Sequence, residues 1–332
     1  MLPAPPLFLY ARGPGPRAEF VKSIHTMPGN YFIINPAAGH GRAGRFWAAL
    51  SAPALRLAPG SSFALTARPG HAAELARAAA LAGAEKIVAV GGDGTFCEAL
   101  EGVLGDPEAA RRRPALGAVP AGSGCDLARH LGCPRDRDGL IAMLARGRTR
   151  LMDAGRLTYV RNDGSSGVRH FINIAAFGLA GDVAHHIKET GKPLGGTLSY
   201  AYSSLRAIFT ARARSLRLKA DGRDISGRYH LGVLANTSSM GGGMLIAPGT
   251  RDDDGLMDLV LVADMSRLEL ARNMPSLYKG THVGRPGITL TRLRRLEADS
   301  DETVYLNIDG EAEGRLPAVF EVLPGAVRVV EP

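Results

Sequence analysis

The chain has few cysteines, few aromatic residues and no long apolar run, and each shortage excludes a class of protein. Of its 332 residues, three are cysteines and 6% are aromatic. Cys97, Cys125 and Cys133 are too few for a disulfide framework and too unevenly spaced for a zinc knuckle, so a reducing compartment is expected. No apolar run reaches the roughly 18 to 20 residues of a membrane-spanning helix, and the N-terminus lacks the basic start of a signal peptide. We therefore expect a soluble, cytoplasmic protein.

Acidic residues are also in deficit, which favours anionic partners. The chain has 32 Asp and Glu against 40 Lys and Arg, a formal net charge of +8. Arginines cluster at residues 111–113, 206–219 and 285–295, although each cluster is also compatible with an ordinary solvated surface. Nucleic acid is not an expected partner, because the aromatic residues that usually interleave with basic ones are scarce. No GxxxxGK[ST] segment occurs, which excludes a P-loop enzyme.

The pattern of elements predicts an α/β class protein with two domains. Residues 1–29 show no periodicity and predict a flexible extension. Beyond them, short apolar strands alternate with helices, as in a mostly parallel sheet covered by helices. Strands are expected at 31–34, 62–66, 86–90 and 116–119, and helices at 42–50, 71–81, 96–104 and 127–130.

After residue 153, strand-like segments follow one another and predict an antiparallel, β-rich second domain. Strands are expected at 170–175, 215–219, 229–235, 257–262, 287–292, 303–308 and 319–323, and helices at 199–211 and 267–274. The cleft between the two domains is the natural place for a functional site.

Three glycine loops follow predicted strands, at Asn35–Gly41, Gly91–Thr95 and Pro120–Asp126. Ligands of open α/β sheets bind at the carboxyl ends of strands, where glycine lets backbone N–H groups approach phosphate oxygens. Each loop alone is compatible with a tight turn, but the three together predict a phosphate-bearing ligand. Asp93 lies inside the second loop and would repel phosphate, so it indicates either a bridging Mg²⁺ or a base.

A dinucleotide-binding motif also occurs in the sequence, but it is weak evidence for a dehydrogenase. Residues 39–44 match the dinucleotide fingerprint GxGxxG. The second predicted strand ends at Thr66 without the acidic residue that a bound ribose would require, and a dehydrogenase is therefore disfavoured.

The loop Gly91–Thr95, together with Asn35 and Pro36, resembles the diacylglycerol kinase catalytic-domain family. That family includes bacterial diacylglycerol and related lipid kinases and the sphingosine and ceramide kinases. The likeness continues, in order along the chain, through residues 120–124, 241–243 with Pro248, 253–256 and 309–311.

The resemblance implies a nucleotide-binding α/β domain at residues 30–152, completed by a strand that returns at about 324–332. It implies a β-sandwich domain for the lipid substrate at residues 153–323. ATP and Mg²⁺ are the implied cofactors. By similarity, ATP would be held by Asn35, Pro36, Ala37, Ala38, Gly39, Thr66, Gly91, Gly92, Asp93, Gly94, Thr95 and Ser123.

The resemblance also implies a structural Mg²⁺ on the carboxylate of Asp254 and the backbone carbonyls of Arg251 and Leu256, oxygen ligands that suit this ion. Without the family, the acidic run at residues 252–255 would be interpreted as a polar turn. Asp182 falls where the sphingosine kinase branch has its carboxylate for the substrate headgroup, and a helix N-cap or surface role is the alternative.

Three carboxylates are candidates for the general base. Asp309 and Glu311 are two residues apart and would project to one side of an extended chain. Asp93 is the rival base by likeness to the sphingosine kinase branch. The Asp309-Gly310 pair is at the same time a strong hairpin-turn signal.

Two residues depart from the family pattern. Cys97 and Cys125 stand where the family commonly has Asn, and a thiol does not donate and accept as an amide does. Because of these two thiols, a catalytically inactive regulator that binds lipid or nucleotide is an alternative function. Ser123 replaces a frequent Thr, as it does in the sphingosine kinase branch.

The predicted function is an ATP- and Mg²⁺-dependent lipid kinase that phosphorylates a diacylglycerol-type hydroxyl. The alternatives are a ceramide or sphingoid-base kinase, an NAD kinase and the inactive regulator. The lipid substrate implies peripheral association with a membrane surface, through the basic clusters or through insertion of residues 1–10 or 240–246. A homodimer is compatible with the sequence.

Overall fold

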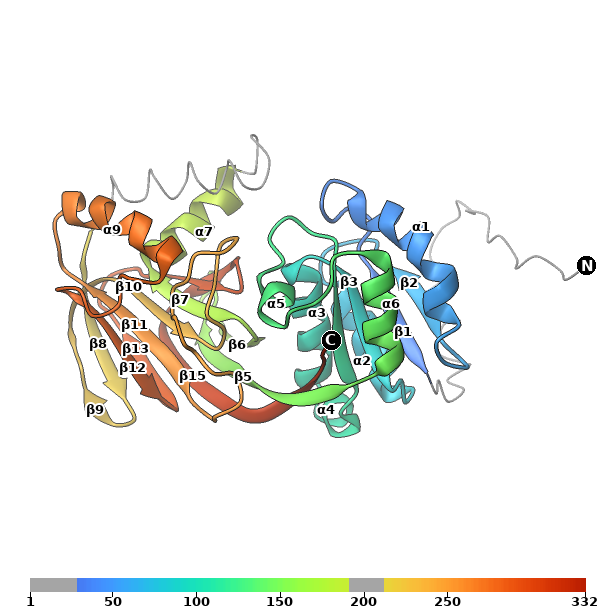
Figure 1. The fold of residues 1–332 in the computed structure, drawn as a ribbon. Helices are drawn as coiled ribbons and strands as arrows, with labels where there is room; N and C mark the ends of the chain where they lie inside the picture. The colour runs from blue at the N-terminus through green and yellow to red at the C-terminus, as the bar shows by residue number, and fades with distance from the viewer. Residues whose placement is uncertain (1–28, 191–211) are drawn as a thin grey trace, which may run out of the picture.

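The computed structural model describes residues 29–190 and 212–332 (Figure 1). The extension predicted at 1–29, apart from Gly29, and the helix predicted at 199–211 lie outside the described residues. So do residues 1–10, the first of the two segments expected to insert into a membrane.

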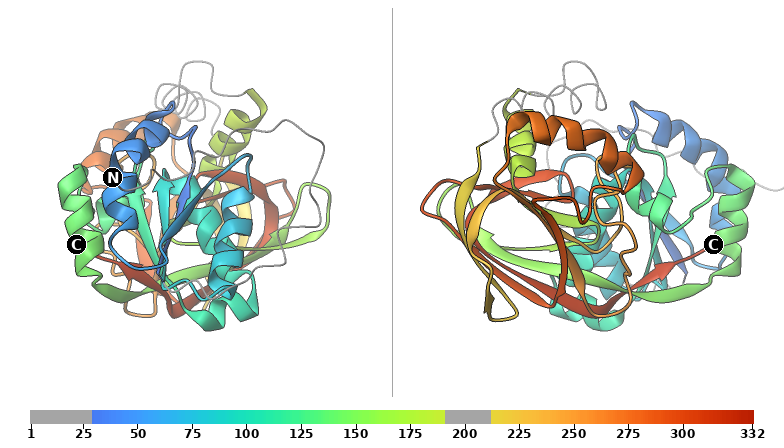
Figure 2. Two further views of the ribbon diagram at one scale, coloured as in Figure 1. Left: turned by 90° about the vertical axis from the view of Figure 1, so that its right-hand side faces the viewer. Right: turned by 60° about the vertical axis from the view of Figure 1, so that its left-hand side comes forward.

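The N-terminal half alternates strands with helices. Its elements are β1 (Asn30–Ile34), α1 (Arg42–Leu55), β2 (Ser62–Leu65), α2 (His71–Leu81), β3 (Lys86–Gly91), α3 (Asp93–Leu104), α4 (Pro107–Arg112), β4 (Ala115–Pro120), α5 (Asp126–His130) and α6 (Arg137–Arg146). The strands lie in the order β2-β1-β3-β4, with each neighbouring pair parallel. Helices α1 and α6 lie on one face of this sheet, and α2, α3 and α4 on the other (Figure 2).

The C-terminal half is built mostly of antiparallel strands. Its elements are β6 (Ser166–Phe171), β7 (Ile174–Gly178), α7 (Leu179–Thr190), β8 (Arg214–Ala220), β9 (Arg223–Asp224), β10 (Gly227–Ala235), β11 (Met257–Ala263), α9 (Arg267–Lys279), β12 (Ile288–Leu293), β13 (Arg295–Asp299) and β14 (Tyr305–Ile308). The strands β12-β11-β10-β7-β14 follow one another in antiparallel pairs. The prediction of a mixed α/β chain with a C-terminal antiparallel β domain is therefore confirmed.

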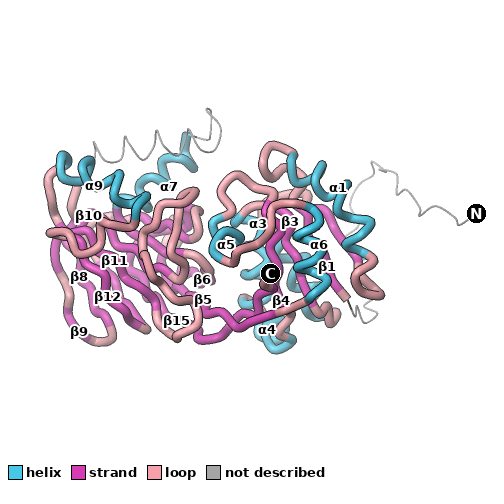
Figure 3. The backbone as a smooth tube through the Cα atoms, viewed as in Figure 1, coloured by secondary structure: helices cyan, strands magenta, loops and turns pink. Residues whose placement is uncertain are grey.

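Two long strands join the halves (Figure 3). They are β5 (Thr149–Val160) and the 20-residue β15 (Glu311–Val330), which pair antiparallel along their length. The last residues of β15 pair in parallel with β4, and Val329 and Val330 are buried in the N-terminal core. Phe320, earlier on the same strand, is buried in a C-terminal core. One strand thus anchors its two ends in two different cores.

The prediction of one continuous strand at residues 170–175 is wrong. The structure ends β6 at Phe171 and begins β7 at Ile174. The strand expected at 319–323 is part of the much longer β15, although Pro317, Pro324 and Gly325 would normally interrupt a strand. Irregularities in the pairing of β15 with β5, between Arg315 and Ala318 and between Leu323 and Val327, accommodate these residues.

Candidate active site

The second and third glycine loops pack backbone against backbone at the carboxyl ends of β3 and β4. The N–H groups of Ala121 and Gly122 donate to the carbonyl of Gly91 at 2.8 and 3.0 Å. A Cβ atom on Gly122 would lie 2.4 Å from the Cα of Gly92. A side chain at Gly122 would therefore separate the two loops, and only glycine permits this approach.

The first glycine loop joins the same edge of the sheet. Asn35 accepts the N–H of Ala37 at 3.1 Å and donates from its amide to the hydroxyl of Thr95 at 3.3 Å. Gly39 has a positive φ of 59°, and a Cβ there would lie 2.3 Å from the carbonyl oxygen of Ala121. The three loops therefore form one contiguous backbone surface.

The residues predicted to contact a nucleotide all lie on these loops or at the end of β2. Thr66 directly follows β2, and its N–H donates to the carbonyl of Ile34 at 2.8 Å. Ser123 is exposed on the third loop. The structure thus gathers the predicted set at one edge of the sheet, and the contacts with a nucleotide stay a prediction.

Two arginines near these loops were missed at the level of sequence. The guanidinium of Arg42 donates to the carbonyls of Gly122 at 2.9 Å and Gly39 at 3.1 Å, and so links the first and third loops. Arg129 donates to the carbonyl of Gly124 at 3.2 Å. Both cations lie beside the backbone surface on which phosphate was predicted. A basic residue immediately after a glycine loop was the available signal for Arg42.

Asp93 caps a helix. Its carboxylate accepts the N–H groups of Asp126 at 3.0 Å and Leu127 at 3.1 Å, at the start of α5. Burial raises the pKa of Asp93, and the charge of Asp309 adds to that rise, while the two N–H groups oppose it. A carboxylate in a phosphate-binding loop was expected either to face a bridging Mg²⁺ or to act as a base. The structure supplies backbone donors to this carboxylate.

Asp309 is held by donors from two other parts of the chain. It lies in the tight turn between β14 and β15 with a φ of 48°, as the Asp-Gly signal predicted. Its carboxylate accepts the N–H groups of Ile172, Asn173 and Ile174, each at 2.9 Å, and the thiol of Cys97 at 3.2 Å. Burial raises the pKa of Asp309, and these donors oppose the rise. Asp309 therefore ties α3 to the junction of β6 and β7.

Glu311 differs from the other two candidate bases in its exposure. It opens β15 opposite Ile308, directly after the turn that holds Asp309. Its side chain is exposed, whereas Asp93 and Asp309 are partly covered and bonded to backbone N–H groups. Of the three candidate bases, Glu311 is the residue with the exposed side chain.

The loop at residues 240–246 also lies against the N-terminal half. Gly242 donates its N–H to the carboxylate of Asp126 at 2.8 Å. Met240, Met244 and Ile246 are at most 8% exposed and belong to a C-terminal core. The expectation that this segment inserts into a membrane is therefore wrong, because its apolar side chains are already buried inside the protein.

At the candidate magnesium site, both carboxylate oxygens of Asp254 have partners within the protein. One oxygen of Asp254 accepts the N–H of Leu256 at 3.1 Å, and the other lies 3.3 Å from the guanidinium of Arg292. Arg251 pairs through its side chain with Asp253. No group of three or more His, Cys, Asp or Glu side chains suited to a metal occurs in the described part of the chain. An ion at this site would have to displace Arg292 from Asp254, and the Mg²⁺ site stays a prediction.

Asp182 is engaged in an ion pair. It lies in the first turn of α7, and both its oxygens face the guanidinium of Arg214, at 2.9 and 3.1 Å. Several other arginines of the basic clusters are similarly neutralised, Arg217 by Asp299 and Asp301, and Arg295 by Glu297 and Glu321. These clusters therefore present less free charge than the sequence suggested.

The fold and site together define a two-domain phosphotransferase-type protein, in which glycine loops and carboxylates of both halves meet. The model of the diacylglycerol kinase catalytic domain matches residues 30–157, and that of the YegS C-terminal NAD kinase beta sandwich-like domain matches residues 173–331. The chain is 31% identical over 265 residues to a diacylglycerol kinase of Bacillus subtilis, covering 79% of this chain and 83% of that one. It belongs to the diacylglycerol kinase family.

Further similarities agree with this assignment. A diacylglycerol kinase of Staphylococcus aureus is 30% identical over 246 residues, or 74% of each chain. A solved structure of a diacylglycerol kinase from Bacillus anthracis superimposes with a TM-score of 0.69 at 18% identity, covering 92% of this chain and 97% of that one. A second structure from that organism gives a TM-score of 0.74 at 20% identity, with the same coverage. The structural matches support the fold.

Proposed function

We propose that this protein is a lipid kinase that transfers the γ-phosphoryl group of ATP to the hydroxyl of a diacylglycerol-type lipid. The observation that carries the proposal is the joining of three glycine loops into one backbone surface, with an exposed carboxylate contributed from the other half of the chain. The named relatives are diacylglycerol kinases, and membership of their family supports this acceptor.

In this proposal the loops bind the triphosphate. Backbone N–H groups of Gly39, Gly94 and Ser123, one from each loop, face its oxygens, and the guanidinium groups of Arg42 and Arg129 add positive charge. The phosphate charge would be partly neutralised by Mg²⁺ when it is bound with ATP. Such preorganised donors stabilise the charge that develops on the transferring group.

Glu311 is the proposed general base. A carboxylate that takes the proton of the attacking hydroxyl has to reach the substrate, and Glu311 is the exposed one of the three candidates. Asp309 holds the turn that precedes Glu311, and so positions it. Asp93 keeps the start of α5 in place beside the third loop.

The acceptor is tested by transfer from radiolabelled ATP to a panel of diacylglycerol, ceramide and sphingosine in mixed micelles, with NAD as a soluble acceptor. We expect label in the diacylglycerol product. Label in ceramide or sphingosine, the acceptors suggested by Ser123 and Asp182, or in NAD would replace diacylglycerol by that acceptor. Binding of ATP with no transfer to any acceptor would make the protein the inactive regulator.

Peripheral association with the cytoplasmic membrane surface is part of the proposal, because the substrate is a lipid. None of the helices in residues 29–190 and 212–332 is long and apolar enough to cross a bilayer. Flotation with liposomes tests the association, and we expect more protein to float with anionic than with neutral lipid. Equal flotation would contradict a role of the basic residues.

A further inference from the structure

Helix α9 lies on the outside of the C-terminal half and carries an exposed apolar stripe (Figure 1). Its inner face packs on a C-terminal core through Leu270, Met274 and Leu277. Leu268 and Tyr278 are each 59% exposed, more than any other large apolar residue in the described part of the chain. At about 100° per residue, four exposed residues of α9 share its outer face: Leu268, Ala271, Pro275 and Tyr278.

Basic residues flank this apolar stripe on both sides. Arg267 lies along one edge of the outer face, and Arg272 and Lys279 lie along the other. All three are exposed, and none of their side chains forms a hydrogen bond or an ion pair within residues 29–190 and 212–332. Glu269 is the one acidic residue of the helix, and its carboxylate accepts the N–H and the hydroxyl of Ser266 at 2.8 and 2.7 Å.

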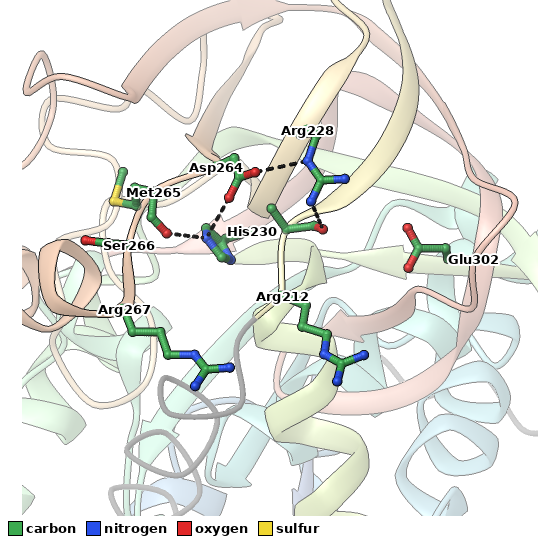
Figure 4. Close-up of a pocket in the computed structure, with 9 residues that line it drawn as sticks. Arg212, Arg228, His230, Asp264, Met265, Ser266, Arg267 and Glu302 are labelled. Carbon is green, nitrogen blue, oxygen red and sulfur yellow. Dashed lines mark hydrogen bonds and ion pairs between the residues drawn. The ribbon is translucent and has the colours of Figure 1, made fainter.

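The acidic residue just before α9 already has a basic partner. The carboxylate of Asp264 lies 3.0 Å from the guanidinium of Arg228 and 3.6 Å from the ring of His230. Figure 4 shows the guanidinium of Arg267 apart from this group and without an ion pair to it. The three cations of α9 therefore place unbalanced positive charge beside the apolar stripe.

The C-terminal end of α9 lies close to the candidate active site. The N–H of Leu245 donates to the carbonyl of Leu277, in the last turn of α9, at 2.8 Å. Three residues earlier, the N–H of Gly242 donates to the carboxylate of Asp126, at the end of the third glycine loop, also at 2.8 Å. Because three residues of extended chain span at most about 11 Å, a surface that contacts α9 also lies near this loop.

We propose that the outer face of α9 docks the protein on an anionic membrane surface. The inference rests on the proposed function, because a diacylglycerol-type substrate resides in a bilayer. Leu268 and Tyr278 enter the interface between headgroups and acyl chains, where tyrosine is enriched. The three flanking cations bind lipid phosphates. An apolar stripe with basic residues at its edges is typical of helices that lie in the plane of a membrane.

Vesicle binding of the full chain tests the charged part of this surface. Vesicles of phosphatidylcholine are compared with vesicles of equimolar phosphatidylcholine and phosphatidylglycerol, which we call the mixed vesicles. The assay contains neither ATP nor diacylglycerol, so a failure of the docking and a failure of the proposed kinase activity are measured separately. The triple substitution Arg267→Gln, Arg272→Gln and Lys279→Gln should weaken binding to the mixed vesicles about 100-fold. Unchanged binding by this variant would overturn the proposal.

A matched triple variant controls for net charge. Arg111→Gln, Arg146→Gln and Arg223→Gln together remove the same charge from exposed positions on other elements. Because salt screens charges that are distant from the docked surface, this variant should bind the mixed vesicles within about threefold of the unsubstituted chain. An equal loss in the two triple variants would assign the binding to net charge and contradict a role of α9.

The double substitution Leu268→Ser with Tyr278→Ser tests the apolar stripe. It should weaken binding to the mixed vesicles at least about tenfold, because it removes the two largest apolar side chains from the interface. Its control is Leu151→Thr with Val168→Thr, which changes two residues of β5 and β6 that are each 49% exposed. The control should bind as the unsubstituted chain does, and equal losses in the two double variants would overturn the stripe as the docking surface.

A fluorescent label measures insertion directly. The three native cysteines are buried, so a thiol introduced by Leu268→Cys is open to selective labelling with an environment-sensitive dye. Its emission should shift to the blue when the mixed vesicles are added, whereas the same dye on Val168→Cys should not respond. An unchanged emission at residue 268 would contradict insertion of the outer face.

A second copy of this chain is the competing occupant of the same face. Sedimentation velocity compares the unsubstituted chain with the Leu268→Ser, Tyr278→Ser variant. We expect the same oligomeric state for both, since the stripe contacts lipid. A dimer that the double substitution converts to a monomer, with vesicle binding unchanged, would overturn the membrane assignment and make the face an interface between copies.

Discussion

At the scale of single residues, Asp309 shows how a buried charge holds two halves of a chain together. Removing a carboxylate from water is costly unless hydrogen bonds replace the lost hydration. Three consecutive backbone N–H groups and the thiol of Cys97 provide them. Burial also raises the pKa of Cys97 well above its usual range, so the thiol stays protonated and acts as a donor.

Replacement of Asp309 by Asn is expected to destabilise the protein by about 3 kcal/mol. The amide has one accepting oxygen where the carboxylate has two, and its NH₂ group would face backbone donors that then lose their partner. Urea denaturation measures the change in the free energy of unfolding. Asp301→Asn, which removes one exposed ion pair with Arg217, is the control and should cost less than about 1 kcal/mol. Equal losses in the two variants would contradict the role of Asp309.

The sequence could predict the turn at Asp309 but not the contacts of its side chain. Asp-Gly after an alternating strand is a local signal, and it correctly predicted the hairpin. The four donors come from positions more than 130 residues away, and no local pattern relates them. Cys97 was noticed as a departure from the family, and its contact with Asp309 gives the thiol a role as a hydrogen-bond donor.

At the scale of elements, the glycine loops depend on one another. The backbone contacts of Gly91 with the third loop, and the Asp93 cap on α5, fix the second and third loops as a unit. A sequence shows that each loop follows a strand, but not which backbone groups of one loop meet those of another. The binding of Asp93 to α5 was accordingly not predicted.

Asp93→Asn is expected to destabilise the chain by about 1 to 2 kcal/mol, the usual cost of a weakened helix cap. It should also weaken ATP binding severalfold, because the third loop would no longer be held at the start of α5. Denaturation and ATP titration measure the two effects.

A matched control for this variant is Asp106→Asn. Asp106 caps α4 through the N–H groups of Glu108 and Ala109, on a helix outside the glycine loops. This variant should lose stability and bind ATP normally. If Asp93→Asn also binds ATP normally, the cap does not organise the nucleotide loops.

Strand boundaries in the C-terminal half illustrate a second limit of sequence interpretation. Residues 170–175 are mostly apolar, and a single strand was the reasonable prediction. The chain breaks at Ile172 and Asn173, where backbone N–H groups turn to Asp309 in place of a neighbouring strand. Such a break depends on a carboxylate that is distant in the sequence, and the hydrophobic periodicity gives no indication of it.

At the scale of the whole molecule, Asp252 ties the two halves together. It accepts hydrogen bonds from the guanidinium of Arg150 on β5 at 2.8 and 2.6 Å and contacts His130 of α5 at 2.9 Å. Burial by itself would raise the pKa of Asp252, but these partners outweigh burial and lower the pKa from 3.8 to about 2. The ionised form is therefore favoured by folding.

The lowered pKa predicts a specific loss of stability in acid. A carboxylate whose pKa falls on folding stabilises the protein above its ordinary value of 3.8, and the benefit disappears as the pH falls through about 2. The contribution is about 2 kcal/mol. Asp252→Asn should be less stable at pH 7 and should lose less stability between pH 4 and pH 2, as measured by urea denaturation.

Asp253→Asn is the control for this prediction. Asp253 is an exposed neighbour that pairs with Arg251 on the surface, and its substitution should change stability little at any pH. The same acid-induced loss in Asp252→Asn and in the unsubstituted chain would contradict the assignment.

The central claim is that ATP bound by the glycine loops is attacked by a lipid hydroxyl whose proton passes to Glu311. The most direct test compares transfer of labelled phosphate from ATP to diacylglycerol by the unsubstituted chain and by Glu311→Gln. Because the side chain is exposed, the variant should fold and bind ATP normally, while kcat falls about 100-fold or more. A kcat within threefold of the unsubstituted chain would contradict the claim.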